Sequence, residues 1–269
     1  MRLARIMTMA VIIGIGIFNL RQAALNWTLS DAAAYWNAAM RLREGGDLYP
    51  MLTTVDASDV YRYAPWFAWL AVPFTYLPIQ AAGALWSAML LLASGVALVP
   101  LMRVRAWLLL ALMLPILVGI SAVGNVQPLL IAGLIHGVER RSGPLWIALA
   151  ASLKIFPILL AAVYAGRRQW WRLAASIVLT VVLWAPALLY DLRGYATEPG
   201  LAASLISVPI LYALAVGGSL LASLRLARTR YGWLAAATTV TVALPRLFVY
   251  DVTYVMLGVL PAQREPPPG

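Results

Sequence analysis

The chain has 269 residues, of which 63% are hydrophobic and only 11% are charged, and its mean hydropathy is +0.84. A soluble domain carries roughly 25% charged residues, so this chain has too little charge to cover a water-facing surface. The composition excludes a soluble nucleotide-binding enzyme and a disordered chain, and it predicts an all-α polytopic membrane protein. The chain has no cysteine and only one histidine, His136, which excludes disulfides, thiolate chemistry and histidine-based zinc sites.

The net charge of +10 does not indicate a nucleic-acid partner. Nineteen of the 20 basic residues are arginines, and they lie in short clusters between apolar runs. Clusters of this kind determine membrane topology. The first apolar stretch follows Arg2 and Arg5 and has no small-residue cleavage site, so we expect an uncleaved first span with a cytoplasmic N-terminus.

Residues 26–63 form the only long polar segment and hold five of the ten acidic residues. Within this segment, Ser30 and Asp31 are expected to cap a short helix that runs to about Arg43 and stops at Gly45-Gly46. Its apolar side chains fall on one face. This pattern predicts a short amphipathic helix that lies on the membrane surface.

Nine further apolar segments complete about ten transmembrane helices, in a single domain over residues 1–261. They are predicted at 64–80, 82–102, 106–123, 125–138, 144–165, 173–190, 201–223, 231–247 and 249–261. Several are short or contain proline, which is tolerated where protein or water satisfies the freed backbone groups. The tail at 262–269 is expected to be disordered.

If every predicted span crosses the membrane in turn from a cytoplasmic N-terminus, which we call strict alternation, residues 26–63 lie outside. The inner segments then contain arginine clusters without acidic residues, namely Arg167, Arg168, Arg172, Arg225, Arg228 and Arg230. Two turns, Arg103–Arg105 and Arg140-Arg141, violate the rule because alternation places them outside. Gly124-Asn125 falls on the inner side, where we interpret it as a plain turn.

Aromatic and acidic residues gather on the predicted outer face. They are Tyr35, Tyr61 and Tyr63 of the first loop, Asp191 after the seventh span, and Arg246, Tyr250 and Asp251 of the last outer turn. An acid-rich outer loop over broken helices suits an enzyme that acts on lipid-linked substrates. For most of the aromatic residues, an interfacial belt is the simpler interpretation. Asp56 and Asp59 form a single DxxD pair, which is too weak a signal to predict a metal site.

Lys154 is the only lysine and lies within a predicted span. A lysine at the centre of a spanning helix costs about 2.5–3.5 kcal/mol to insert, so such residues usually face a cavity and a partner. We expect no acidic residue within the bundle, and the nearest acids, Asp31, Asp191 and Asp251, are expected at outer helix ends. The shortage of acidic partners for Lys154 favours a cavity in which the lysine binds an anionic ligand. A snorkelling lysine or a structural ion pair is the alternative.

Several of these stretches, in this order, resemble the membrane mannosyltransferases of glycosyltransferase family 87, in the GT-C superfamily. The resemblance covers most of residues 28–175 and a fragment near 245–255. The matching stretches are Asp31 to Trp36, Gly45 to Pro50, Tyr61 to Pro65, Pro73, Leu77-Pro78, Trp86, Gly124-Asn125, Lys154 to Pro157, Arg167-Arg168, Pro245-Arg246 and Tyr250-Asp251.

The resemblance implies an inverting transfer of mannose from polyprenyl phosphate to a glycolipid or cell-envelope glycan, on the outer face of the plasma membrane. It implies one carboxylate base, here Asp31, and no nucleotide sugar, cofactor or essential metal. In this scheme Lys154 and Arg246 bind the donor phosphate. The remaining site residues line the sugar and substrate site, namely Tyr35, Tyr61, Tyr63, Asp191, Tyr250 and Asp251.

Two other classes of protein remain open. A transporter or flippase of lipid-linked sugars would also use broken helices and a buried lysine, but it would be favoured by inverted repeats, which the sequence lacks. A non-catalytic membrane subunit is the third class, and the short chain is its best support.

Overall fold

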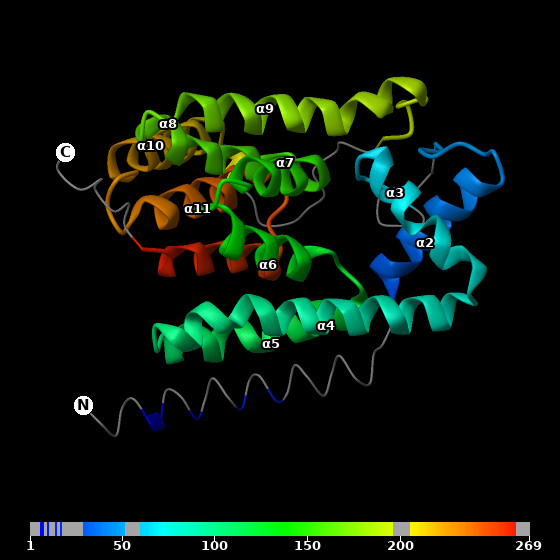
Figure 1. Ribbon diagram of the computed structural model, residues 1–269, viewed down its shortest axis with the longest axis horizontal. Helices are drawn as coiled ribbons and strands as arrows, with labels where there is room; N and C mark the ends of the chain where they lie inside the picture. The colour runs from blue at the N-terminus through cyan, green and yellow to red at the C-terminus, as the bar shows by residue number, and fades with distance from the viewer. Residues whose placement is uncertain are drawn as a thin grey trace. The chain divides into compact units, whose positions relative to one another are not determined.

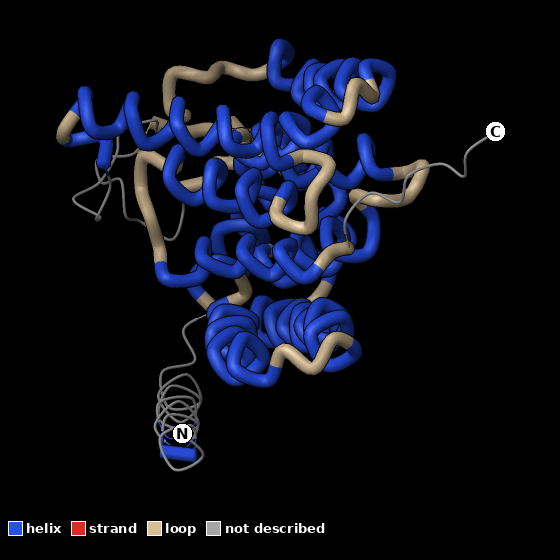
Figure 2. Tube along the Cα trace, turned by 90° about the vertical axis from the view of Figure 1, so that its left-hand side faces the viewer, coloured by secondary structure: helices blue, strands red, loops and turns tan. Residues whose placement is uncertain are grey.

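The computed structural model describes residues 29–51, 60–195 and 205–261, together with isolated positions between 6 and 17. Every regular element in these ranges is a helix (Figure 2), which confirms the all-α prediction. Most of the predicted first span, the Asp56 and Asp59 pair, and the tail at 262–269 lie outside the described residues.

The described helices include several that are apolar and long. Three of them are long and apolar enough to cross a membrane: Ile79–Arg103, Trp170–Leu189 and Pro209–Leu226. Four shorter apolar helices lie at Trp107–Val123, Phe156–Gly166, Gly232–Ala243 and Val249–Val259. These positions support a membrane protein, whereas the count of about ten spans stays a prediction.

The chain divides into two compact units, residues 1–133 with 181–200 and residues 134–180 with 201–269. The single transmembrane domain over residues 1–261 therefore stays a prediction. The helix α6 (Gln127–Gly137) and the helix α9 (Trp170–Trp184) each contain residues of both units.

The first unit is built around a long helical hairpin. Its elements are α2 (Ser30–Arg43), α3 (Pro65–Ala71), η1 (Val72–Tyr76), α4 (Ile79–Arg103), α5 (Trp107–Val123) and η3 (Ala185–Leu189). Helices α4 and α5 run side by side (Figure 1) and are joined by the hydrogen bond between Ser94 Oγ and Ser121 Oγ at 3.1 Å. The start of α4 and the end of α5 therefore lie at the same end of this unit.

Helix α2 forms where the sequence predicts a helix, but its start and its packing differ from the prediction. The residue before the helix is Leu29, with φ of 48° and no side-chain cap, so the predicted Ser30 and Asp31 cap is wrong. The end is confirmed, because Gly45 has a φ of 74°. The apolar face, with Tyr35 at its centre, is buried against α3, η1 and α4. That face packs on protein, and the position of the helix at the membrane surface stays a prediction.

The segment predicted as the span 64–80 is not one spanning helix. Helix α3 has seven residues and η1 has five, and both pack against α2. At standard rises these two helices extend about 20 Å, against about 30 Å for the hydrocarbon core. Arg43, at the end of α2, holds the end of η1 in place, because its Nη1 donates to Thr75 O at 2.9 Å and to Thr75 Oγ1 at 3.0 Å.

The second unit contains the remaining helices. They are α7 (Gly143–Lys154), η2 (Phe156–Ala161), α8 (Ala162–Gly166), η4 (Leu205–Ser207), α10 (Pro209–Leu226), α11 (Gly232–Ala243) and η5 (Val249–Val259). Helices α10 and α11 form an antiparallel pair. It is held by the hydrogen bonds Ser223 Oγ to Thr239 Oγ1 at 2.9 Å and Tyr212 Oη to Ala243 O at 2.8 Å.

The segment predicted as the span 144–165 is a helical hairpin. Helix α7 ends at Lys154, Ile155 has a φ of 44°, and η2 and α8 then run back along α7. The two ends of the segment meet, because Tyr164 Oη donates to Val138 O at 2.6 Å and a β-carbon at Gly143 would overlap the Tyr164 hydroxyl. Lys154 therefore lies at the tip of a hairpin that starts and finishes at one end of the unit.

An ion pair between the buried Arg167 and the partly exposed Glu139 joins three turns at that end. Arg167 Nη1 lies 2.8 and 2.9 Å from the two carboxylate oxygens of Glu139, and Arg167 Nε donates to Ala227 O at 2.7 Å. Trp233 Nε1 also donates to Glu139. The turns at 138–142, 166–169 and 227–231 are thus neighbours. Strict alternation, which separates Arg140-Arg141 from Arg167, is wrong here because the intervening segment folds back.

We expect Ile155→Gly to raise the free energy of unfolding by about 1 kcal/mol. A β-branched residue at positive φ costs about 1–3 kcal/mol, and the unfolded-state freedom of glycine offsets about 0.5–1 kcal/mol of the gain. The matched control is Ile158→Gly in η2, where φ is not positive and the same change should lower stability. Denaturant unfolding in detergent measures both, and equal losses in the two variants would contradict the strained turn.

Candidate active site

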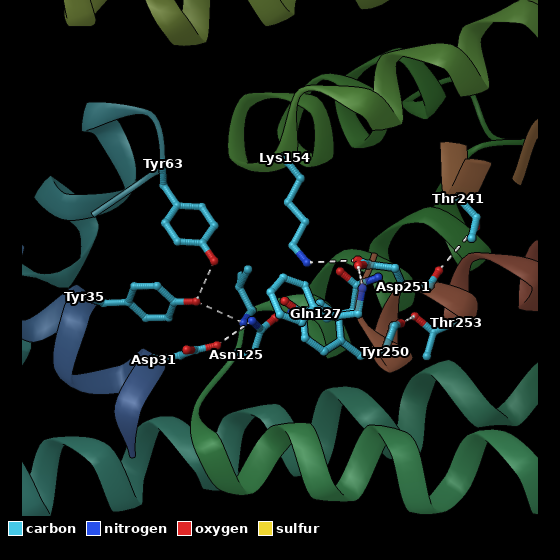
Figure 3. Close-up of polar contacts among 12 residues, drawn as sticks. Asp31, Tyr35, Tyr63, Asn125, Gln127, Lys154, Thr241, Tyr250, Asp251 and Thr253 are labelled. Carbon is cyan, nitrogen blue, oxygen red and sulfur yellow. Dashed lines mark hydrogen bonds and ion pairs between the residues drawn. The ribbon is translucent and has the colours of Figure 1, made fainter. Parts of the chain in front are cut away.

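The first cluster of functional side chains surrounds Asp31 in the first turn of α2 (Figure 3). Asn125 Nδ2 donates to Asp31 Oδ2 at 2.5 Å. Asn125 is buried, and its own Oδ1 accepts the backbone N–H of Gln127 at 2.9 Å. The prediction of Asn125 as a plain turn on the opposite side of the membrane from Asp31 is therefore wrong. The α4–α5 hairpin returns the chain to Asp31.

Gly124 allows the turn after α5 to come close to the first turn of α2. Gly124 has a φ of 84°, and a β-carbon there would lie 2.6 Å from Ala32 Cβ and 2.8 Å from Ala32 N. The same turn is held from α4, because Trp86 Nε1 donates to Gly124 O at 2.7 Å. Only glycine combines the left-handed backbone with this close contact. The turn between α5 and α6 is therefore fixed against the first turn of α2.

Tyrosines line the same region. Tyr35 Oη and Tyr63 Oη form a hydrogen bond of 3.1 Å, and the backbone N–H of Val126 donates to Tyr35 Oη at 3.4 Å. Burial, followed by the neighbouring Tyr63 and Asp31, raises the pKa of Tyr35 well above its ordinary value, so its hydroxyl stays neutral. Tyr61 Oη donates to Ala64 O at 2.9 Å and supports the loop before α3.

An apolar cavity of about 140 Å³ lies beside this cluster, within the first unit. Ala32 and Tyr35, which follow Asp31 on α2, form part of its wall. The other lining residues come from α2, α3, η1 and α4, and they are Trp36, Phe67, Leu70, Ala71, Phe74, Ala82, Gly83, Trp86 and Met89. A carboxylate thus lies close to an aromatic, water-poor space.

The second cluster surrounds Lys154 in the second unit (Figure 3). Its Nζ lies 3.4 Å from Asp251 Oδ1 and 4.3 Å from the ring centroid of Tyr250. Asp251 is 2% exposed and also accepts the backbone N–H of Phe248 at 2.9 Å. The expectation that the bundle holds no acid is wrong, because the first turn of η5 buries Asp251. Asp251 is nevertheless one of the three nearest acids expected from the sequence, and its ion pair with Lys154 is the alternative that the sequence left open.

The two remaining predicted site residues have their own partners. The Arg246 guanidinium lies over the ring of Phe248, 4.9 Å from its centroid. Asp191 pairs with Arg193 at 2.5 Å on an exposed turn, and the Arg193 hydrogen bonds lower the pKa of the Asp191 carboxyl. Across the described ranges, no three His, Asp or Glu side chains are grouped as metal ligands.

The comparisons with known proteins identify the family of the chain. A family model described as glycosyltransferase family 87 matches residues 61–250, which is more than half of the chain. Together with the apolar helices, this match defines the protein as a membrane glycosyltransferase. The chain belongs to glycosyltransferase family 87. No curated protein and no solved structure matches it.

The match covers most of the site but not all of it. Asn125, Lys154 and Arg246 fall within the matched residues, whereas Asp31 and Tyr35 precede them. Sequence reasoning missed the role of Asn125 at this site. The available signal was the Gly-Asn pair itself, since glycine before a buried amide marks a turn that approaches another backbone closely.

We expect Lys154→Met to lower the free energy of unfolding by about 3–5 kcal/mol, because it leaves the buried Asp251 charge without its cation. The double variant Lys154→Met with Asp251→Asn should recover most of this loss. The amide removes the charge and keeps an acceptor for the Phe248 N–H. Denaturant unfolding in detergent measures the stability of the parent and of both variants. Equal instability of the single and double variants would rule out a stabilising ion pair between Lys154 and Asp251.

Proposed function

We propose that this protein is a GT-C-type mannosyltransferase. It transfers mannose from polyprenyl phosphate to a hydroxyl group of a glycolipid or cell-envelope glycan, outside the plasma membrane. The observation that carries the proposal is the Asp31 carboxylate, held by a buried Asn125 amide beside an aromatic cavity, in a chain of glycosyltransferase family 87. Nucleotide sugars, cofactors and metals have no part in it.

The proposed reaction is a single displacement with inversion at the anomeric carbon. Asp31 removes the proton of the acceptor hydroxyl as its oxygen forms the new glycosidic bond, and the bond to the polyprenyl phosphate oxygen breaks. The leaving group departs as a phosphate anion, so it needs little help from a general acid. Lys154 and Arg246 stabilise the charge that develops on it, as fixed cations do in a water-poor site.

The other proposed site residues differ in how directly they act. Tyr35 and Tyr63 offer hydroxyl groups and ring faces to the sugar. Tyr61 positions the loop that carries Tyr63, by donating to Ala64 O. Asp251 and Tyr250 hold the Lys154 ammonium in place for the donor phosphate. Asp191 contributes to acceptor binding from its exposed turn.

The arginine clusters support an orientation for each unit taken by itself. In the first unit, Arg103 and Arg105 lie at the far end of the α4–α5 hairpin from Asp31, since α4 is 25 residues or about 37 Å long. In the second unit, the arginines of the three joined turns lie at one end. If both arginine-rich ends face the cytoplasm, the two turns that break strict alternation obey the positive-inside rule.

We expect Asp31→Asn to lower turnover about 100- to 10,000-fold and to leave folding and donor binding near normal, because the amide is nearly isosteric but accepts no proton. The assay uses purified protein in detergent with mannosyl polyprenyl phosphate and candidate acceptors. Asp47→Asn, on the exposed loop after α2, is the matched control and should match the parent. Asp191→Asn should have a milder effect than Asp31→Asn.

Two results would contradict the proposal. Transfer by Asp31→Asn at the parent rate would exclude Asp31 as the base. The absence of any product from the parent protein, combined with sugar-lipid movement in sealed vesicles, would favour a transporter. A transferase makes product without a sealed compartment, whereas transport cannot be seen without one.

The orientation is tested by single cysteines, since the chain has none of its own. Val104→Cys and Ser142→Cys, both on exposed turns, should be protected from a membrane-impermeant maleimide in intact cells. Leu192→Cys, on the exposed turn after η3, should be labelled. Strict alternation of ten spans predicts labelling of positions 104 and 142, so labelling at either would overturn the two folded-back segments.

A further inference from the structure

The Asn125 side chain is oriented by two hydrogen bonds of opposite polarity. Its Oδ1 accepts the Gln127 backbone N–H at 2.9 Å, and its Nδ2 donates to Asp31 Oδ2 at 2.5 Å. A flipped amide would set oxygen against carboxylate and NH₂ against N–H, so both contacts would become repulsive. The donor nitrogen therefore has to face the carboxylate.

The backbone under this amide is also fixed. The Asn125 N–H donates to Ile120 O at 3.1 Å, which caps the last turn of α5. Gly124 lies against Ala32, and Trp86 donates to Gly124 O at 2.7 Å. Asn125 is 2% exposed, so water does not compete for its amide. The amide is thus presented to Asp31 with little conformational freedom left to lose.

We propose that Asn125 is a positioning residue for Asp31, which fixes the rotamer of the carboxylate and holds it in the form that accepts a proton. This inference rests on the proposed function, in which Asp31 is the base. A hydrogen bond donated to the charged form of a carboxyl favours that form over the protonated acid. Confining the carboxylate also matters for rate, because a misplacement of about 1 Å can cost about 100-fold.

The neighbours of Asp31 in the first unit define what else affects its titration. Tyr35 comes from the same helix, and Tyr63 from the loop before α3 is hydrogen-bonded to Tyr35. Helices α3 and α4 present Phe67 and Trp86 to the ring of Tyr35, and neither residue titrates. Arg43 and Glu44 are at the opposite end of α2. Asn125 donates a hydrogen bond directly to the carboxylate.

The test measures the pH dependence of turnover for purified parent, Asn125→Asp and Asn125→Ala. In Asn125→Asp two carboxylates share one proton, so the acidic limb of the profile should move up by about one pH unit or more. In Asn125→Ala the limb should move in the same direction by less, and turnover should fall about 10- to 100-fold with little change in the KM for donor. Asn37→Asp, six residues after Asp31 on the same helix, adds the same charge and should leave the limb in place.

A purely structural role gives a different result. The Asn125 variants would then lose thermal stability while their acidic limb coincided with that of the parent, and this outcome would overturn the inference. Asn125→Ala introduces no new charge, so it carries the test if Asn125→Asp does not fold. An active parent and an inactive Asp31→Asn, together with unshifted Asn125 variants, would refute this inference alone. An inactive parent, or a fully active Asp31→Asn, would refute the proposed function and this inference together.

Discussion

The ion pair between the buried Arg167 and the partly exposed Glu139 constrains how the second unit is arranged. Arg167 is fully buried at its side chain, and such a charge is tolerated only when it is paired and hydrogen-bonded. Glu139 from the turn before α7, the carbonyl of Ala227 from the turn between α10 and α11, and the ring of Trp233 at the start of α11 supply those partners. Once these turns are joined, the segment between Glu139 and Arg167 has to leave and return at the same end. The reversal of the chain at Lys154 and Ile155 follows from the joining of these turns.

The existence of the helices could be predicted from the sequence, whereas their paths could not. Apolar runs bounded by arginine or glycine gave boundaries within a few residues, as for the predicted 106–123 and the observed Trp107–Val123. A hydropathy pattern does not distinguish a helix that crosses from one that folds back, because both are equally apolar. The reversal at Ile155 rests on a left-handed backbone at a β-branched residue, for which the sequence carries no usual signal. The arginines at 103–105 and 140–141 were the available warning, since they violated the charge rule under strict alternation.

The candidate site was predictable to the same partial extent. Asp31, Tyr35 and Lys154 were found by position, charge and resemblance, but their partners lie 28 to 97 positions away in sequence. Asn125 follows a glycine at the end of an apolar helix, and only the packing of Gly124 against Ala32 reveals that its amide meets a carboxylate. Asp251 lies at a helix end as predicted, in the first turn of η5, but its burial there could not be predicted. Long-range hydrogen bonds of this kind are fixed by the fold as a whole.

The Lys154 and Asp251 pair is compatible with both a structural and a chemical role. The Lys154 side chain is only 13% exposed, so its charge needs the resident carboxylate of Asp251 in the folded protein. At 3.4 Å the contact is longer than the 2.7–2.9 Å usual for a charge-assisted hydrogen bond, and the ammonium also lies over the Tyr250 ring. The carboxylate of Asp251 and the ring of Tyr250 therefore together keep the cation in the folded protein. The proposed mechanism adds the donor phosphate as a further partner of the same ammonium when the substrate binds.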